Sequence, residues 1–204
     1  AQNEAAANRP TVAGTIALGT QSEATATNST IRDVALNKLV QGAAAADATA
    51  ATPGTVGVAA AGTTIRLTAA TPTPTTYDIT IGATTTVRDL VEGINKSGIA
   101  TASVGNDGKL SIVGTGSDAL SVDLGAVAGS PPTFTANAAS ATEIAKLVGT
   151  ADASAVTQAG SSAVRTSLVA QFNDLRDQID TLAKDSGFNG TNLLKAGGGT
   201  VAAL

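Results

Sequence analysis

The sequence predicts an α+β fold, in which a small sheet carries a helix on one face. Two observations in residues 62–128 support this prediction. Runs of alternating apolar and polar residues, typical of half-buried strands, flank a segment with helical spacing. An Asp107-Gly108 turn between two further runs predicts a hairpin. The predicted order of elements in this module is β-β-α-β-β, followed by one more strand.

The segments before the module carry weaker patterns. Residues 1–10 are helix formers that stop at a proline, and we expect them to be the end of a helix. Residues 11–61 begin with a Thr/Ala/Gly-rich stretch without clear periodicity and continue with an amphipathic helix from Thr30 to Gln41. We expect a surface loop over the rest of the segment, or an extension of the helix over its alanine-rich first half.

The two strands before the module's helix each place alternate apolar side chains on one face. Those side chains are Ile65 and Leu67 in the first strand, and Tyr77, Ile79 and Ile81 in the second. We expect this face to be buried in the core.

The helix of the module has recognisable ends. Thr86 can cap its start, and Asp89 stands at the acidic position of a capping box. Apolar residues follow at helical spacing, and Gly98 is placed to end the helix. After the hairpin, Leu120 and Val122 predict the last strand.

The C-terminal third is predicted to be helical. Residues 129–160 begin as a proline-marked linker and contain a short helix near 143–148. Residues 161–204 open with a longer helix that runs to about Lys184 and ends in a turn. Its apolar positions form a narrow heptad-like stripe: Val164, Leu168, Phe172, Leu175, Ile179 and Leu182. Such a stripe fits either an amphipathic helix on a globular core or a helix that packs against a partner helix.

Composition excludes several classes of function. The chain has no His and no Cys, so it contains no Ser-His-Asp or Cys-His triad, no ordinary zinc site and no disulfide. The net charge of -4, with only 12 Lys and Arg, argues against binding to nucleic acid. No apolar run approaches the roughly 20 residues of a membrane-spanning helix. We therefore expect no catalysis, no cofactor, no metal and no membrane insertion.

Two acidic motifs also admit a chemical interpretation. Asp174, Asp177 and Asp180 recur every third residue on the long helix, where they could form an acid/base pair or a cation site. A solvated helix face is the favoured interpretation. Asn106-Asp107-Gly108 lacks the spacing of a calcium loop and is interpreted as a turn.

Two parts of the sequence resemble bacterial flagellin. The run from Gln171 to Leu194, QFNDLRDQIDTLAKDSGFNGTNLL, is similar to the family's N-terminal core helix and the Phe-Asn-Gly turn that ends it. The run TVRDLVEGIN from Thr86 to Asn95, with the ASV, DGKLSI and GS segments that follow it, resembles the IN motif of flagellins and hook-associated proteins.

The resemblance implies a structural subunit of the bacterial flagellar filament, extracellular and without catalysis. Its partners would be other flagellin subunits, the flagellar type III export apparatus and a chaperone. Residues 62–128 would be an outer IN-motif module, inserted between helical segments of a coiled-coil-like core domain at 1–10 and 161–204, as in alphaproteobacterial flagellins. Because the long terminal helices of the family are missing, we expect a fragment that is monomeric in solution.

The resemblance also assigns the residues of assembly. In the stripe these are Leu168, Phe172, Leu175, Ile179 and Leu182, and in the turn Phe188, Asn189, Gly190 and Leu193. An animal innate immune receptor binds this helix in many flagellins through a glutamate. Gln171 stands at the matching position, which argues against recognition here.

Two alternatives remain open. A hook-associated junction or cap protein of the flagellum shares the IN motif, although it usually matches the Phe-Asn-Gly turn less well. A surface adhesin or glycan-binding module would need aromatic side chains on an accessible face, and Tyr77 is the only aromatic residue in the predicted sheet module.

Overall fold

The chain divides into two compact units, Gln2–Gly160 and a second unit made largely of Ser161–Leu204. Helices and strands both occur, and the strands form several small sheets, which agrees with the predicted α+β class. The computed structural model describes residues 9–42, 54–58, 64–70, 73–116, 118–149, 163–185, 187–188 and 191–192.

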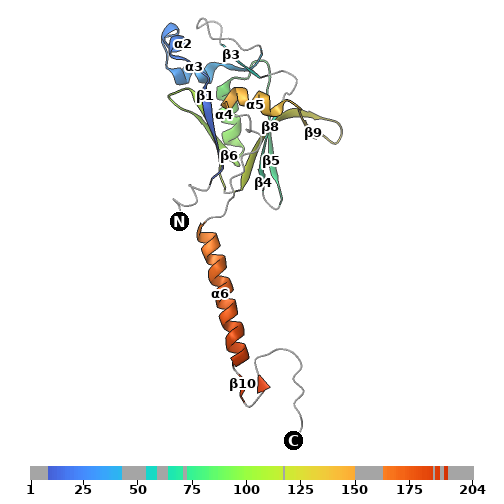
Figure 1. Cartoon of the computed structure of the whole chain (residues 1–204). Helices are drawn as coiled ribbons and strands as arrows, with labels where there is room; N and C mark the ends of the chain where they lie inside the picture. Colours follow the sequence, from blue (N-terminus) through green and yellow to red (C-terminus); the bar gives the residue numbers. More distant parts are fainter. Residues whose placement is uncertain are drawn as a thin grey trace. The chain divides into compact units, whose positions relative to one another are not determined.

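The described elements of the first unit are strands and short helices (Figure 1). In chain order they are β1 (Thr11–Ala17), α2 (Gln21–Ala26), α3 (Ile31–Asn37), β2 (Leu39–Gln41), β3 (Thr55–Val58), β4 (Thr64–Ala70), β5 (Thr75–Thr80), α4 (Val87–Lys96), β6 (Ala100–Val104), β7 (Lys109–Gly114), β8 (Ala119–Ala128), β9 (Thr133–Ala136) and α5 (Ser140–Val148).

One antiparallel sheet has the strand order β1-β7-β6. β6 and β7 form the predicted hairpin, in which Val104 lies opposite Leu110. Gly108 closes the turn with a φ of 76°, a left-handed conformation that glycine adopts without a steric cost. The hairpin and its turn are therefore confirmed.

A second antiparallel sheet has the order β5-β4-β8-β9. The alternation of β4 and β5 is confirmed, because Ile65, Leu67 and Ile79 are buried and Tyr77 is half-buried against the core. The module was expected to form one sheet. Its strands instead divide between two sheets, because β6 and β7 pair with β1 while β4 and β5 pair with β8.

Two helices, α4 and α5, each contact both sheets. α4 packs against β6 and β5, and α5 contacts β8 of one sheet and β1 of the other. The buried apolar residues form one cluster that draws on 11–61, 62–128 and 129–160. These three segments of the sequence therefore share one core rather than forming separate units.

The capping box of α4 is present as predicted. The Thr86 hydroxyl accepts from the Asp89 N–H at 3.2 Å, and the Asp89 carboxylate accepts from the Thr86 N–H at 2.9 Å. The helix ends at Lys96, and Gly98 follows in the left-handed region at a φ of 74°.

The region before the module differs from expectation in three places. The stretch without clear periodicity contains β1, which pairs with β7. The helix expected to reach Gln41 ends at Asn37, and Leu39–Gln41 pairs as a parallel strand with β3, inside the expected loop. The backbone extends here because the Val40 N–H donates to the Thr85 carbonyl, a partner far along the chain.

The second unit contains the predicted long helix, α6 (Ala163–Asp185). Two short strands follow, β10 (Gly187–Phe188) and β11 (Thr191–Asn192), and they pair antiparallel. The short helix expected near 143–148 begins earlier, at Ser140, as α5. The helix expected within 1–10 falls on residues that, Arg9 and Pro10 apart, lie outside the described ranges.

Candidate functional site

The candidate site is one face of α6. The helix contains no Gly or Pro over its 23 residues, so nothing in its interior interrupts the backbone hydrogen bonds. At 1.5 Å per residue it is roughly 35 Å long. Side-chain exposure is described from Ser167 to Leu182, and every one of these residues is exposed.

Apolar side chains line this face at alternating spacings of three and four residues. All are more than half exposed, whereas each residue of the core in the first unit is less than 9% exposed. The side chains and their exposed fractions are Leu168 (59%), Phe172 (67%), Leu175 (56%), Ile179 (60%) and Leu182 (69%). We call these five residues the stripe. The Val164 side chain lies outside the described residues.

Val169 widens the stripe at its N-terminal end and is 55% exposed. The prediction omitted it because it does not fit the heptad pattern. It follows Leu168 directly and therefore lies at the edge of the same face. In a coiled coil this is the position that flanks a core residue.

The stripe favours association over solvation. Fully burying a Leu, Ile or Phe side chain stabilises by roughly 1.5–3 kcal/mol relative to leaving it exposed. An isolated helix is only marginally stable in water, because most helical stability in proteins comes from packing of the apolar face. A second apolar surface laid along the stripe would therefore stabilise the helix and bury the exposed side chains together.

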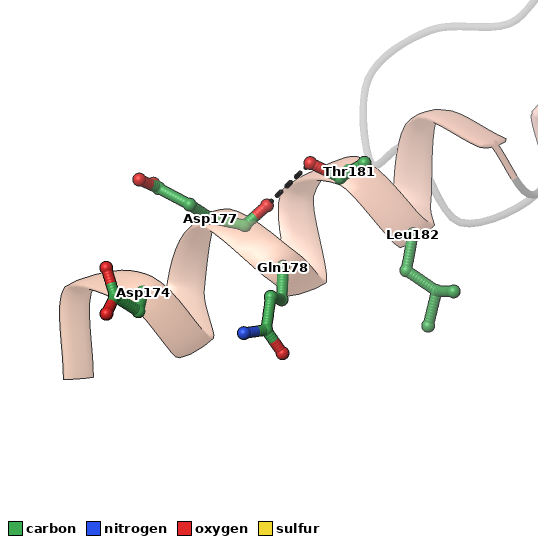
Figure 2. A pocket seen from close by; sticks show the side chains of 5 residues that line it. All are labelled: Asp174, Asp177, Gln178, Thr181 and Leu182. Atoms are coloured by element: carbon green, nitrogen blue, oxygen red, sulfur yellow. Dashed lines mark hydrogen bonds between the residues drawn. The ribbon is translucent and has the colours of Figure 1, made fainter. Parts of the chain in front are cut away.

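The described polar side chains of α6, together with Leu182 of the stripe, form no enclosed site. Asp174, Asp177, Gln178, Thr181 and Leu182 border an open hollow, and all five side chains come from the one helix (Figure 2). The Thr181 hydroxyl donates to the Asp177 carbonyl at 2.8 Å, and Arg176 Nη2 lies 3.7 Å from the Asp177 carboxylate. These are contacts of a solvated helix face, where ion pairs contribute little.

The turn residues assigned to assembly are only partly described. Phe188 belongs to β10, whose backbone pairs with β11 so that Phe188 lies opposite Thr191. Asn189, Gly190 and Leu193 lie outside the described residues. The structure therefore places the backbone of one of the four turn residues directly after α6.

A second polar cluster, not predicted from the sequence, lies on the four-stranded sheet. Arg66 of β4 makes a bidentate pair with Asp78 of β5, with distances of 2.6 and 2.7 Å. The guanidinium also lies 4.2 Å from the centre of the Phe134 ring. Asp123 of β8 stands opposite Arg66 on the other side. Alternation predicts the face of each strand, but only the register brings these four side chains together.

The surroundings shift the pKa values of the two carboxylates in this cluster in opposite directions. The hydrogen bonds from Arg66 lower the pKa of Asp78. Burial raises the pKa of Asp123, because the charged form loses hydration that Ser121 and Arg66 only partly replace. Asp78 also raises the pKa of Arg66 through the same hydrogen bonds. The cluster is a charge-compensated surface whose only aromatic ring is already covered by a guanidinium.

The described part of the first unit contains a small cleft of about 180 Å³ where the ends of the two sheets meet. This is below the range of roughly 300–1,000 Å³ typical of ligand pockets. Its lining is apolar or uncharged except for Asp118. Among the described residues no group of three or more potential ligands is placed to hold a metal ion.

None of the helices in the described ranges is long and apolar enough to cross a membrane. Comparison with models of known protein families, with curated proteins and with solved structures gave no match to this chain.

Proposed function

We propose that this chain is part of a structural subunit of a bacterial flagellar filament, and that α6 is an assembly surface. The observation that carries the proposal is the stripe: five large apolar side chains, each more than half exposed, along one face of a helix in its own compact unit. A helix with this face gains stability when it packs against other helices, as the subunits of a helical filament do.

The flagellar assignment rests on the resemblance of two sequence segments. The segment from Gln171 to Leu194 contains α6 from its ninth residue onward together with β10 and β11, and the IN-like run coincides with α4 and its cap. In this proposal the first unit lies outside the helical core of the filament, and the partners are other subunits, the export apparatus and a chaperone. The protein acts outside the cell through assembly rather than catalysis.

The surface of the first unit is consistent with an outer position. Its exposed large apolar residues in the described ranges are Ile16 and Val127, which are 44% and 40% exposed. In the polar cluster on the four-stranded sheet, Arg66 and Asp78 pair with each other. Isolated apolar residues of this kind are ordinary on a solvated protein surface.

Immunogold electron microscopy of the bacterium that produces the protein tests this function. Antibodies raised against the 204-residue chain are expected to label extracellular filaments along their whole length. Deletion of the gene is expected to remove the filaments and the swimming motility.

The same images separate the alternatives. Label confined to the base or tip of the filament would support a hook-associated protein, and label over the cell body would support an adhesin. Filaments that persist unlabelled in the deletion strain would overturn the proposal.

A further inference from the structure

The side chain of Asn95 takes the place of a neighbouring strand at the edge of a sheet. Asn95 lies in the last turn of α4 and faces β6, the edge strand of the β1-β7-β6 sheet. Its Oδ1 accepts from the Ala102 N–H at 2.7 Å, and its Nδ2 donates to the Ala102 carbonyl at 3.2 Å. This double hydrogen bond is the one that a residue of an antiparallel strand would make with Ala102.

The pairing within the sheet shows that these groups belong to the free edge. In an antiparallel pair, the peptide groups of successive residues point alternately toward and away from the partner. The Ile99 carbonyl accepts from the Thr115 N–H at 3.0 Å, on the side of β7. The Ile99 carbonyl and the backbone N–H and C=O groups of Thr101 and Ser103 therefore point toward β7. The N–H and C=O groups of Ala100, Ala102 and Val104 point outward, away from the sheet.

Ser97 occupies the next position along the same edge. Its hydroxyl oxygen accepts from the Ala100 N–H at 3.4 Å and from the Ile99 N–H at 3.2 Å. Two of the three outward-facing residues of β6 thus have an N–H bonded to side chains at the C-terminal end of α4.

The sequence of β6 itself contains none of the usual features that protect an edge strand against strand addition. Natural edge strands are commonly defended by Lys, by inward-pointing charges, by Pro or by a bulge. The strand reads Ala-Thr-Ala-Ser-Val and contains none of these residues, and its pairing with β7 runs without a shift in register. An identical strand of a second copy would meet no charge on it.

The opposite edge of the sheet is defended differently. β1 carries a shift in register between Ala13 and Ala17, and its Thr15 hydroxyl donates to the Val148 carbonyl at the end of α5. A bulge and a covering helix end are two known means of blunting an edge. At β6, the hydrogen bonds to outward-facing backbone groups come from the side chains of Asn95 and Ser97.

We propose that Asn95, assisted by Ser97, is an edge guard that prevents β6 from pairing with β6 of a second copy. The proposal does not depend on the flagellar function, because it concerns the first unit alone. A protein present at high local concentration in an assembly needs such protection, since an open edge pairs with any available strand.

The test compares the self-association of variants of the full chain by sedimentation velocity. Asn95→Ala removes both hydrogen bonds to Ala102, and alanine is a better helix former than asparagine, so α4 is not weakened. We expect an association constant at least tenfold above that of the unmodified chain. Lys96→Ala is the matched control, an exposed neighbour in the same helix turn, and is expected to leave association unchanged.

A reversal variant distinguishes pairing at β6 from association of a partly unfolded chain. Thr101→Lys and Ser103→Lys, added to Asn95→Ala, place two charges on the exposed side chains of β6 without restoring the guard. We expect the triple variant to return to the association constant of the unmodified chain. If it stays associated, the contact is not made through β6 and the proposal is wrong.

Hydrogen exchange measured by NMR supplies the local readout. In dilute Asn95→Ala the Ala102 amide is expected to exchange at least tenfold faster, and to become protected again as the protein associates. Faster exchange without increased association would leave Asn95 as a tie between helix and sheet and would overturn the guard. If Asn95→Ala does not fold, Asn95→Ser, which adds no charge and is too short to bond both backbone groups of Ala102, must show the same change in smaller degree.

Discussion

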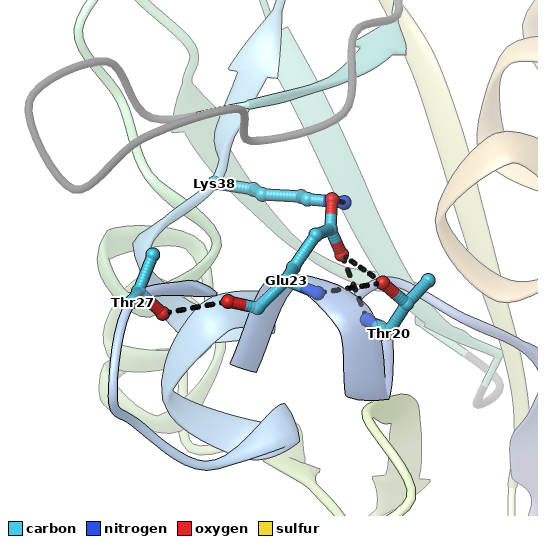
Figure 3. A network of polar contacts seen from close by, with 4 residues as sticks. All are labelled: Thr20, Glu23, Thr27 and Lys38. Atoms are coloured by element: carbon cyan, nitrogen blue, oxygen red, sulfur yellow. Dashed lines mark hydrogen bonds and ion pairs between the residues drawn. The ribbon is translucent and has the colours of Figure 1, made fainter. Parts of the chain in front are cut away.

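Lys38→Met is expected to destabilise the first unit by about 3 kcal/mol, through a buried ion pair. Lys38 Nζ lies 2.9 Å from Glu23 Oε1, and the two side chains are 11% and 6% exposed. Glu23 Oε2 accepts from the N–H and the hydroxyl of Thr20, at 2.8 and 2.9 Å (Figure 3). Removal of Lys38 leaves a buried carboxylate without its cation.

The expected loss of stability depends on which interactions of the Glu23 carboxylate the substitution removes and which it leaves. Breaking a buried pair by removal of one partner typically costs about 3–5 kcal/mol. Glu23 retains two hydrogen bonds from Thr20, each of the charge-assisted kind that contributes about 1.5–3 kcal/mol, so the loss should fall at the lower end of that range. Glu23→Gln with Lys38→Met removes both charges and keeps a capping-box residue. The double variant should therefore be about 1–2 kcal/mol less destabilised than the sum of the single variants.

Urea unfolding followed by tyrosine fluorescence measures this cycle. The chain has one tyrosine and no tryptophan, so the signal comes from Tyr77 in β5 and reports on the first unit. Lys109→Met is the control, because the Lys109–Asp107 pair is exposed and longer, at 3.5 Å, and should change stability by less than about 0.5 kcal/mol. A Lys38→Met variant as stable as this control, or strictly additive single variants, would refute the reasoning.

Three further predictions concern α6 and the polar cluster around Arg66. Phe172→Gln is expected to lower the amount of protein found in filaments sheared from cells at least tenfold, whereas Asn173→Gln on the polar face should leave that amount unchanged. Neither variant should change the urea unfolding curve measured by tyrosine fluorescence. Asp78→Asn removes a carboxylate whose pKa is lowered below 3.8 by Arg66. Its stabilisation is present above that ordinary value and is lost as the pH falls through the lowered pKa. The variant is therefore destabilised by up to about 1 kcal/mol at pH 7, and the difference from the parent shrinks as the pH falls. Burial raises the pKa of Asp123, so its stabilising effect exists only at low pH, and Asp123→Asn should be neutral or stabilising at pH 7. Urea unfolding at pH 7 and pH 2 checks both signs, and equal effects of the two variants would contradict them.

The sequence predicted the elements whose signals are local. The capping box at Thr86, the turn at Gly108 and the alternation around Ile65 each depend on residues a few positions apart, and the structure contains all three. The stripe was predictable for the same reason, since helical spacing alone places Leu168 and Phe172 on one face.

The elements that were missed depend on distant partners. β1 lacks alternation because one of its residues, Gly14, comes so close to the Leu110 carbonyl that a Cβ would not fit. Leu39 follows Leu36 at helical spacing, yet the backbone there is held by Thr85 and by β3. The polar cluster around Arg66 needs its four side chains in register across four strands. No pattern within one segment contains that information.

The exposed apolar side chains are concentrated on the surface for which we propose association. Eight large hydrophobic residues are exposed in the described part of the chain, and six of them lie on α6. In the first unit, by contrast, the free edge of β6 is occupied by Asn95, and Arg66 is paired with Asp78. A subunit that polymerises by chance contacts would aggregate, because sheet edges and apolar patches accept any partner. In the proposed filament, the concentration of apolar surface on one helix, together with the closed edge of β6, would confine association to a defined geometry, as an ordered filament requires.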